Sequence, residues 1–289
     1  MARDYVDGAR LALRVLGGFE VCVGDRTVSL PANAQRVLGY LAVARAESRR
    51  EVLAGHLWSW TNQARAQANL RTALWRVRKA SAQLITSKRD VVRLGMSVRV
   101  DYTEMTSCAL RLFDTTVAPE DVLITSPRLF EGDLLPGWDE DWLLIDRERH
   151  RQLRMHALEA LSRQLVDCGE YARAVDAAYA AIAIEPLYES AQATLIAAHL
   201  AEGNRTEAIR QFTAFRRLLY DETGLAPSPS LFKELEPVLA EAAHPRWRQN
   251  NDYRTRPRPS VSSRPAHAGG LDTVRDLPTG SASEPRQLP

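Results

Sequence analysis

The chain has little cysteine and no long apolar stretch. Its three cysteines, Cys22, Cys108 and Cys168, are odd in number and far apart, and no two form a Cys-x-x-Cys pair. This spacing disfavours a disulfide framework and a zinc site, and it fits a reducing cytoplasm. The longest apolar run covers residues 177–184, whereas a membrane-spanning helix needs about 20 apolar residues. The N-terminus has no apolar signal core, so we expect a cytoplasmic protein with no membrane contact.

Arrangements typical of enzymes are also missing. No glycine loop that would cradle a phosphate and no Gly-x-Ser-x-Gly turn is present. The six histidines show no metal-ligand spacing with cysteine or with one another. Trp138 and Trp142 bracket three acidic residues, which is compatible with a sugar site, but at helical spacing such side chains more often anchor a helix in the core. We therefore expect no catalytic residue, no metal and no cofactor.

The net charge of +2 conceals an uneven distribution along the chain. Residues 1–102 carry 17 Lys and Arg against 8 Asp and Glu, residues 103–244 carry 13 against 24, and residues 245–289 carry 8 against 4. A basic first third next to an acidic middle is expected when the first domain meets a polyanion and the second does not. The alternative is that the basic side chains only keep a small domain in solution.

Short β-prone runs frame the first 102 residues. Runs at 11–16, 19–23 and 27–30 are separated by glycine-containing turns and predict an antiparallel meander. Two later runs flank the polar turn 87–90 and predict a hairpin, and residues 98–100 add another extended piece.

Three helices are predicted between the meander and the hairpin. The first runs through about residue 46, and Ser48 caps the second, which places Val52, Leu53, Leu57 and Trp58 on the buried side. Asn62 or Thr61 caps a third, longer helix that runs to about residue 83. Together with the strands, these helices predict an α+β domain.

The third helix has a cationic face. At 100° per residue its apolar side chains share one arc, which predicts a core face, and no acidic residue occurs between Asn62 and Ser87. Because five positive charges on one face repel one another with no compensating ion pair, the pattern favours a partner rich in phosphates, and the major groove of a duplex admits such a helix. The face collects Arg65, Ala68, Arg71, Thr72, Trp75, Arg76, Arg78 and Lys79.

Side-chain chemistry divides these residues by role. Arg71 and Arg76 are the candidates for base edges, because arginine forms a two-pronged contact with guanine O6 and N7. Thr72 and Trp75 are expected at a thymine methyl or the backbone, although Trp75 has the alternative of packing inward against Trp58 or the hairpin. Each arginine has the alternative of being a solvated side chain. The other cations are expected at phosphates or, from the hairpin tip, at an adjacent backbone or narrow minor groove: Arg65, Arg78, Lys79, Lys88 and Arg89.

The middle of the chain, residues 103–244, is predicted to be helical and to contain a repeat. A Gly-x-x-x-x-Ala segment at 169–174 returns at 203–208, a shift of 34 residues. Thirty-four is the tetratricopeptide period, in which paired helices stack. Beyond residue 244, proline, serine and arginine leave almost no apolar material, so residues 245–289 are predicted to be a disordered tail.

Motifs in a fixed order over about 230 residues resemble the Streptomyces antibiotic regulatory protein (SARP) family. The first half of the match is LRVLGGFEV at 13–21, QRVLGYL at 35–41, LAGHLW at 53–58 and NLRTALWRVRK at 69–79. The second half is LLPGW at 134–138, EPLYE at 185–189 and ETGLAPSP at 222–229.

The resemblance implies a winged helix-turn-helix domain of the response-regulator type at 1–102, followed by a tetratricopeptide-like bacterial transcriptional activator domain at 103–244. Residues 62–83 would be the recognition helix, with Asn69 among its DNA-binding residues, and 84–93 the wing. A small SARP is expected to bind direct repeats near the promoter −35 region, as a homodimer on DNA, and to recruit RNA polymerase holoenzyme to antibiotic biosynthesis genes. The alternatives are a helical interaction scaffold and a repressor with the same DNA-binding domain.

Overall fold

A four-stranded sheet opens the fold. The computed structural model describes residues 11–114 and 117–231. Strands β1 (Leu11–Arg14), β2 (Glu20–Val23) and β3 (Arg26–Thr27) form the predicted meander, and β7 (Val98–Val100) adds to the other edge of β1 in parallel, giving the order β3-β2-β1-β7. Leu11, Ala12 and Leu13 of β1 are buried together with Val21 of β2, which lies opposite Leu13 in the pair.

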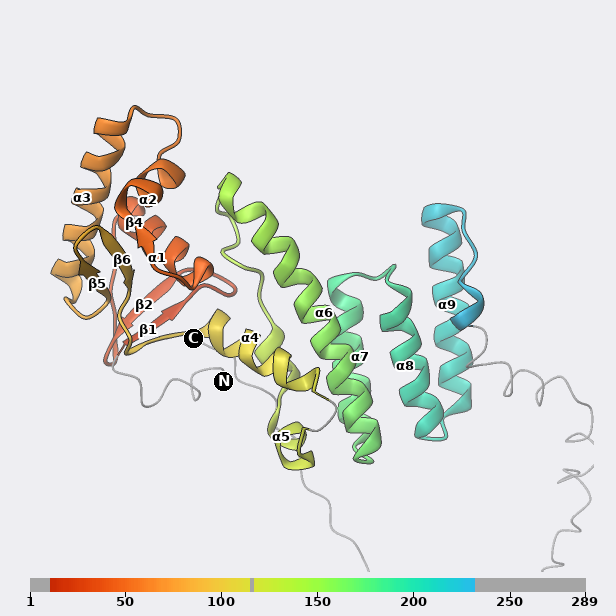
Figure 1. The fold of residues 1–289 in the computed structure, drawn as a ribbon. Coiled ribbons are helices and arrows are strands. Elements are labelled where there is room, and N and C mark those ends of the chain that lie inside the picture. Colours follow the sequence, from red (N-terminus) through yellow and green to blue (C-terminus); the bar gives the residue numbers. More distant parts are fainter. Residues whose placement is uncertain (1–10, 115–116, 232–289) are drawn as a thin grey trace, which may run out of the picture. The chain divides into compact units, whose positions relative to one another are not determined.

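Helices α1 (Ala32–Ala44), α2 (Arg50–Leu57) and α3 (Gln63–Ala80) follow (Figure 1). Two predictions for α2 are wrong. Ser48 does not cap it: Ser48 and Arg49 form a short strand, β4, that pairs with the hairpin, and α2 starts one residue later without a side-chain cap. Val52 is 48% exposed, whereas Leu53, Leu57 and Trp58 are buried as predicted.

The predicted hairpin is confirmed, with a tighter turn. Strand β5 (Ile85–Lys88) pairs with β6 (Val91–Leu94) through a two-residue turn, so Ser87 and Lys88 lie in the strand and not in the turn. Arg89 adopts φ +53°, as the first residue of such tight turns often does. Leu84, Ile85 and Val92 are buried and hold the hairpin against the helices.

The second half of the described chain is helical, as predicted. Its elements are α4 (Asp101–Leu112), α5 (Pro119–Ile124), two 3-10 turns η1 (Pro127–Phe130) and η2 (Asp141–Leu143), α6 (Leu144–Asp167), α7 (Tyr171–Ile184), α8 (Glu189–Ala201) and α9 (Arg205–Thr223). Helices α6 to α9 pack in sequence order (Figure 1). Gly169 and Gly203, the repeated glycines, both have positive φ directly after a helix.

The loop between η1 and η2 joins the two halves through backbone hydrogen bonds. The N–H of Leu135 donates to the carbonyl of Val15 (2.8 Å), and the N–H of Gly17 donates to the carbonyl of Asp133 (2.9 Å). Gly132 has φ +89°, and a Cβ there would lie 2.7 Å from the Gly17 nitrogen, so this close approach requires glycine. One continuous core therefore runs from the sheet through α1–α3 into α4, α6 and α7.

Trp138 and Trp142 belong to this junction. Trp138 lies in the loop before η2, so the expectation that it anchors a helix is wrong; its ring packs on Phe19 and on the backbone at Gly39. Trp142 lies in η2 and meets Tyr40 edge to face, with ring centroids 5.1 Å apart.

The predicted tail at 245–289 lies outside the described residues. Within the described ranges, no helix combines the length and apolar character that crossing a bilayer requires.

Candidate nucleic-acid interface

Helix α3 separates a buried face from a cationic one. The helix is capped by Asn62, one of the two residues predicted for this role. The side-chain oxygen of Asn62 accepts a hydrogen bond from the Arg65 N–H (2.9 Å). Its buried residues are those predicted from periodicity, apart from the half-buried Ala80: Ala66, Leu70, Ala73, Leu74 and Val77. The apolar stripe packs α3 on α1 and α2, which leaves the opposite face to solvent.

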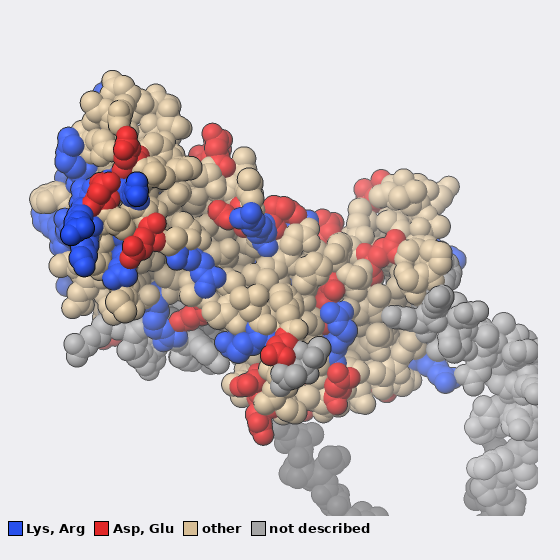
Figure 2. Space-filling view, viewed as in Figure 1, with Lys and Arg blue, Asp and Glu red and all other residues tan. Residues whose placement is uncertain are grey.

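The predicted DNA-binding side chains lie on this outward face and on the hairpin. Nine of the ten are exposed, and Asn69 is half-buried at the edge of the face. Figure 2 shows Lys and Arg gathered over the region of α3 and the hairpin. The exposed nine are Arg65, Arg71, Thr72, Trp75, Arg76, Arg78, Lys79, Lys88 and Arg89.

None of the seven cations in this set has a carboxylate partner among the described residues. Other arginines of the same half do: Arg14 pairs with Glu20 (3.2 Å), and Arg99 pairs with Glu104 (2.6 Å). The difference follows from the absence of acidic residues along α3. Unneutralised positive charge therefore remains on the face, and it favours an anionic partner.

Trp75 is 54% exposed and does not pack against Trp58, which is buried in the core; the inward alternative is wrong. Two cations of the same face stack on the Trp75 ring. The Arg76 guanidinium carbon lies 4.9 Å and the Lys79 Nζ 5.4 Å from the ring centroid. The indole thus restricts the rotamers of Arg76, one of the two base-edge candidates.

Thr72 uses its hydroxyl hydrogen locally. The hydroxyl donates to the Ala68 carbonyl one turn earlier (3.1 Å). The side chain therefore has its methyl group and the oxygen lone pairs left for a partner. This favours the predicted apolar contact with a thymine methyl over hydrogen-bond donation to a base.

Arg50 ties the hairpin to α2, and sequence reasoning missed it. Its Nη2 donates to the Ser87 hydroxyl (2.9 Å), and its Nε is buried without a partner among the described residues. The contact spans 37 residues, so no local pattern could have indicated it. Arg50 positions β5, and with it Lys88, relative to the helices.

Asp101 connects the sheet to the helical half and was also missed. Its carboxylate accepts hydrogen bonds from the N–H groups of Val15, Leu16 and Tyr102 at 2.7–3.1 Å. Burial raises the pKa of this carboxyl above its usual value, although the three N–H donors favour the charged form. Asp101 is the first residue of α4, so its side chain ties the start of this helix to the backbone that directly follows β1.

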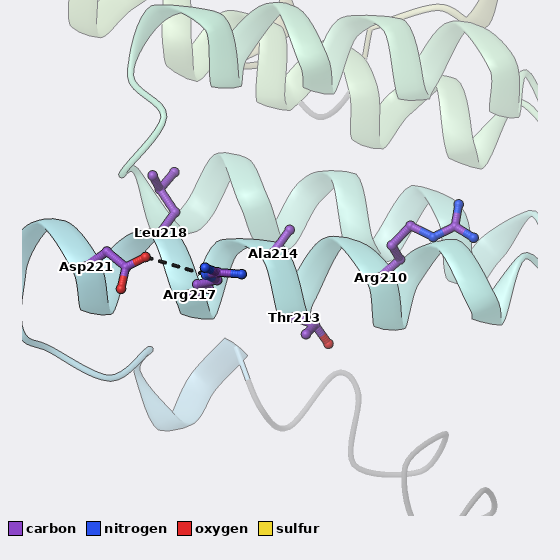
Figure 3. A pocket seen from close by; sticks show the side chains of 6 residues that line it. All are labelled: Arg210, Thr213, Ala214, Arg217, Leu218 and Asp221. Atoms are coloured by element: carbon purple, nitrogen blue, oxygen red, sulfur yellow. Dashed lines mark ion pairs between the residues drawn. The ribbon is translucent and has the colours of Figure 1, made fainter.

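A hollow of about 610 Å³ along α9 lies far from these residues in the sequence. Figure 3 shows that its lining side chains project from one helix, with Arg217 paired to Asp221 at 3.6 Å. Among the residues that the structure describes, no side chain from a second element lines the hollow, so they form no convergent set of polar groups there.

Residues 120–239 match the family described as bacterial transcriptional activator domain. The chain is similar to the regulatory protein AfsR of Streptomyces coelicolor, with 27% identity over 258 residues. The aligned part covers 83% of the chain and 26% of AfsR. The chain thus spans about a quarter of the length of that curated relative. Its fold is similar to that of Mycobacterium tuberculosis EmbR, solved in complex with a low affinity phosphopeptide: the TM-score is 0.66 and the identity 17%, over 80% of this chain and 65% of EmbR.

Proposed function

We propose that this chain is a transcriptional regulator of the SARP type that binds promoter DNA in a sequence-specific manner and activates transcription; the match to the bacterial transcriptional activator domain and the similarity to AfsR support the proposal. In this proposal residues 1–102 form a winged helix-turn-helix domain. Helix α3 enters the major groove and the β5–β6 hairpin is the wing. The order of strands and helices resembles the order expected for the SARP family, and this resemblance supports the assignment of a winged helix-turn-helix domain.

One observation carries the proposal: an amphipathic helix presents a row of cations that no carboxylate of the described chain neutralises. A duplex supplies a dense array of phosphates and releases counterions when they are neutralised. A helical interaction scaffold alone would leave this face unexplained.

The role that we propose for each residue at the DNA follows from the chemistry of its side chain. Arg71 and Arg76 read guanine edges, while Thr72 and Trp75 contact a thymine methyl or the adjacent sugar. Asn69 lies at the edge of the face, where an amide can pair with adenine. The remaining cations hold the helix and the wing on the backbone: Arg65, Arg78, Lys79, Lys88 and Arg89.

We propose that the acidic helical half contacts a protein partner and not DNA. Its surplus of negative charge opposes contact with phosphates, so it suits recruitment of RNA polymerase holoenzyme. Two copies of the chain would bind direct repeats near the −35 region in the same orientation. By resemblance to the family, the proposed targets are antibiotic biosynthesis genes, and the proposed location is the cytoplasm.

The decisive experiment combines genomic binding with sequenced fragments and transcription in vitro. Chromatin capture with the full chain should recover one repeated motif upstream of a small set of genes. Transcription from such a fragment with purified holoenzyme should rise when the protein is added. Falling transcription would indicate a repressor, and the absence of an enriched motif would refute sequence-specific binding.

A further inference from the structure

Two neighbouring hollows flank the middle of α6, away from α3. One, of about 440 Å³, extends toward Pro136, Gly137 and Leu144; the other, of about 480 Å³, extends toward α7 and η1. Both are lined by Arg151, Arg154 and Asp133, so these side chains separate and connect them. Each volume lies in the range of small-molecule sites, roughly 300–1,000 Å³.

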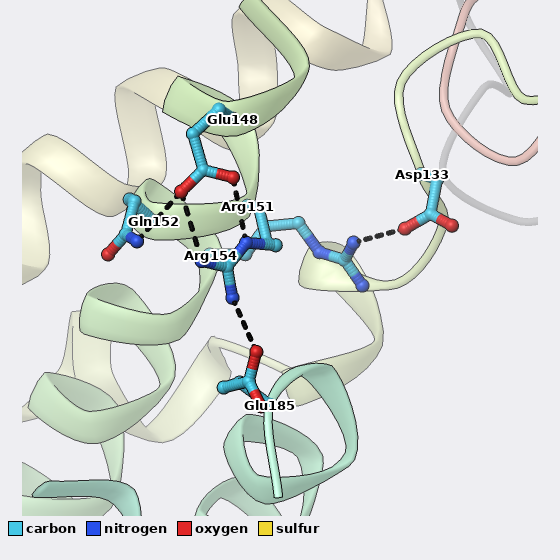
Figure 4. A network of polar contacts seen from close by, with 6 residues as sticks. All are labelled: Asp133, Glu148, Arg151, Gln152, Arg154 and Glu185. Carbon is cyan, nitrogen blue, oxygen red and sulfur yellow. Dashed lines mark hydrogen bonds and ion pairs between the residues drawn. The ribbon is translucent and has the colours of Figure 1, made fainter. Parts of the chain in front are cut away.

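Arg154 lies inside while its carboxylate partner lies in solvent, whereas the side chains of Arg151 and its partner Glu185 are exposed to a similar degree, 34% and 39%. Arg154 is held by the Phe130 carbonyl (2.6 Å) and by Asp133 (2.8 Å); its side chain is 10% exposed, whereas that of Asp133 is 81% exposed. Arg151 pairs with Glu148 (2.9 Å) and Glu185 (3.3 Å), as Figure 4 shows. A single-point ion pair whose carboxylate is in water contributes little, so an incoming anion can replace Asp133 at small cost, whereas Glu148 holds Arg151 through two hydrogen bonds.

Two polar groups here have unused capacity. Nη2 of Arg154 makes no hydrogen bond to any described residue. His150, which lines the first hollow, is 2% exposed; its Nε2 lies 3.1 Å from the Gly132 carbonyl, while its buried Nδ1 has no partner in the described chain. Because Nε2 donates to that carbonyl, Nδ1 is an acceptor and offers nothing to an anion; the donor capacity available to an anion is that of Arg154 Nη2.

The floor of the second hollow is apolar. It is formed by Leu158 of α6, by Ala180 and Ile184 of α7, and by Phe130 of η1, with Ala183 at the rim. The same hollow is also lined by the guanidinium-bearing Arg151 and Arg154 and by the carboxylates Glu131 and Asp133. A molecule with an anionic head and an apolar body matches both parts at once.

We propose that this groove between α6, α7 and η1 binds a small organic anion. Its carboxylate, sulfonate or phosphate head lies against Arg151 and Arg154, and its apolar body covers Leu158, Ala180 and Ile184. The proposal is independent of the DNA-binding function. The loop that carries Asp133 also carries the backbone contact to Gly17, so an occupant would bear directly on the joint between the two halves.

The test compares two probes on the full chain. 8-Anilinonaphthalene-1-sulfonate has an anionic head on an apolar body, and N-phenyl-1-naphthylamine has the same body without the sulfonate. Fluorescence titration should show at least tenfold tighter binding of the sulfonate. R151Q should weaken binding of the sulfonate about tenfold and leave the neutral probe unchanged. R163Q is the matched control, because Arg163 is an exposed, ion-paired arginine of the same helix outside both hollows.

A second variant tests the apolar floor. Ala183 is exposed at the rim of the hollow, so A183W fills the space without disturbing the core and should weaken both probes. Circular dichroism verifies that each variant keeps its helicity. Equal affinity for the two probes, or a sulfonate affinity that neither R151Q nor A183W changes, would overturn the proposal.

Discussion

Arg36 of α1 and Glu140 of the loop before η2 form a two-pronged ion pair across 104 residues of sequence. Nε and Nη2 of Arg36 donate to the two carboxylate oxygens at 2.5 and 2.6 Å, and each side chain is 12% exposed. Trp142 Nε1 donates to the same carboxylate (2.9 Å), and the Arg36 guanidinium also stacks on Trp60, 4.6 Å from the ring centroid. The loop that leads into α3 is thus attached to the helical half through one guanidinium.

Removal of this carboxylate should destabilise the protein. Glu140→Ala leaves the buried Arg36 charge and the Trp142 N–H without their partner, so the free energy of unfolding should fall by about 3 kcal/mol. Urea denaturation measures the loss. The control is Glu104→Ala, which breaks the exposed pair with Arg99 and should cost no more than about 1 kcal/mol. Equal losses in the two variants would contradict the structural role of the Arg36–Glu140 pair.

The double substitution Arg71→Ala with Arg76→Ala should weaken specific binding strongly. Each two-pronged contact with guanine contributes about 1–3 kcal/mol, so affinity for the target repeat should fall by about 2–6 kcal/mol while helicity is kept. Fluorescence anisotropy with the captured promoter fragment measures the change. Arg216→Ala with Arg217→Ala, two exposed arginines of α9, is the charge-matched control. An unchanged footprint for the Arg71 and Arg76 variant would remove both residues from the interface.

Binding should weaken steeply with salt. If five side chains contact phosphates, the logarithm of the association constant should fall against the logarithm of salt concentration with a slope of about −4.5. Lys79→Ala should reduce the magnitude of this slope by about 1 and weaken binding to specific and to random DNA alike. Titrations between about 50 and 200 mM salt measure the slope. A flat titration is incompatible with docking through this face.

His150 should make stability fall in acid. Burial lowers the pKa of His150 to about 4, so the unfolded chain takes up the proton first as the pH falls. The free energy of unfolding should therefore decrease between pH 6.5 and 4, by up to about 3 kcal/mol from this group, and level off below. His150→Gln should remove this part of the pH dependence. The raised pKa of Asp101 acts in the opposite direction in both proteins, so the difference between them isolates His150. Identical pH profiles would contradict the assignment.

Truncation before α9 should cause aggregation. Phe212, Phe215 and Leu219 of α9 form a buried cluster with Ile196 of α8. A chain that ends at Gly203 exposes the α8 side of this cluster, because stacked helices depend on their neighbours for burial. Light scattering and thermal unfolding report the result. A chain that ends at residue 244 keeps every described element and should stay monodisperse. Cooperative unfolding of the shorter chain would count against the stacking requirement.

Features governed by local chemistry were predictable. The cap at Asn62, the two faces of α3 and the hairpin depend on residues within one helix turn or one strand pair, so spacing alone indicates them. The start of α2 was predicted wrongly because Ser48 has an ordinary capping side chain but lies opposite Val92, and strand pairing with β6 takes precedence there. Trp138 was misassigned for a similar reason: its spacing from Trp142 looks helical, but the loop docks on Gly39.

By itself, the order of residues determined where charge accumulates, which stretches form helices, and which side of α3 can reach a partner, because these depend on periodicity and composition. Only the folded chain decided that β7 joins β1, that Arg50 reaches Ser87, and that Arg36 reaches Glu140. These contacts join segments separated by 37 to 104 residues. Their partners are selected by the closure of a shared core, which no local pattern encodes.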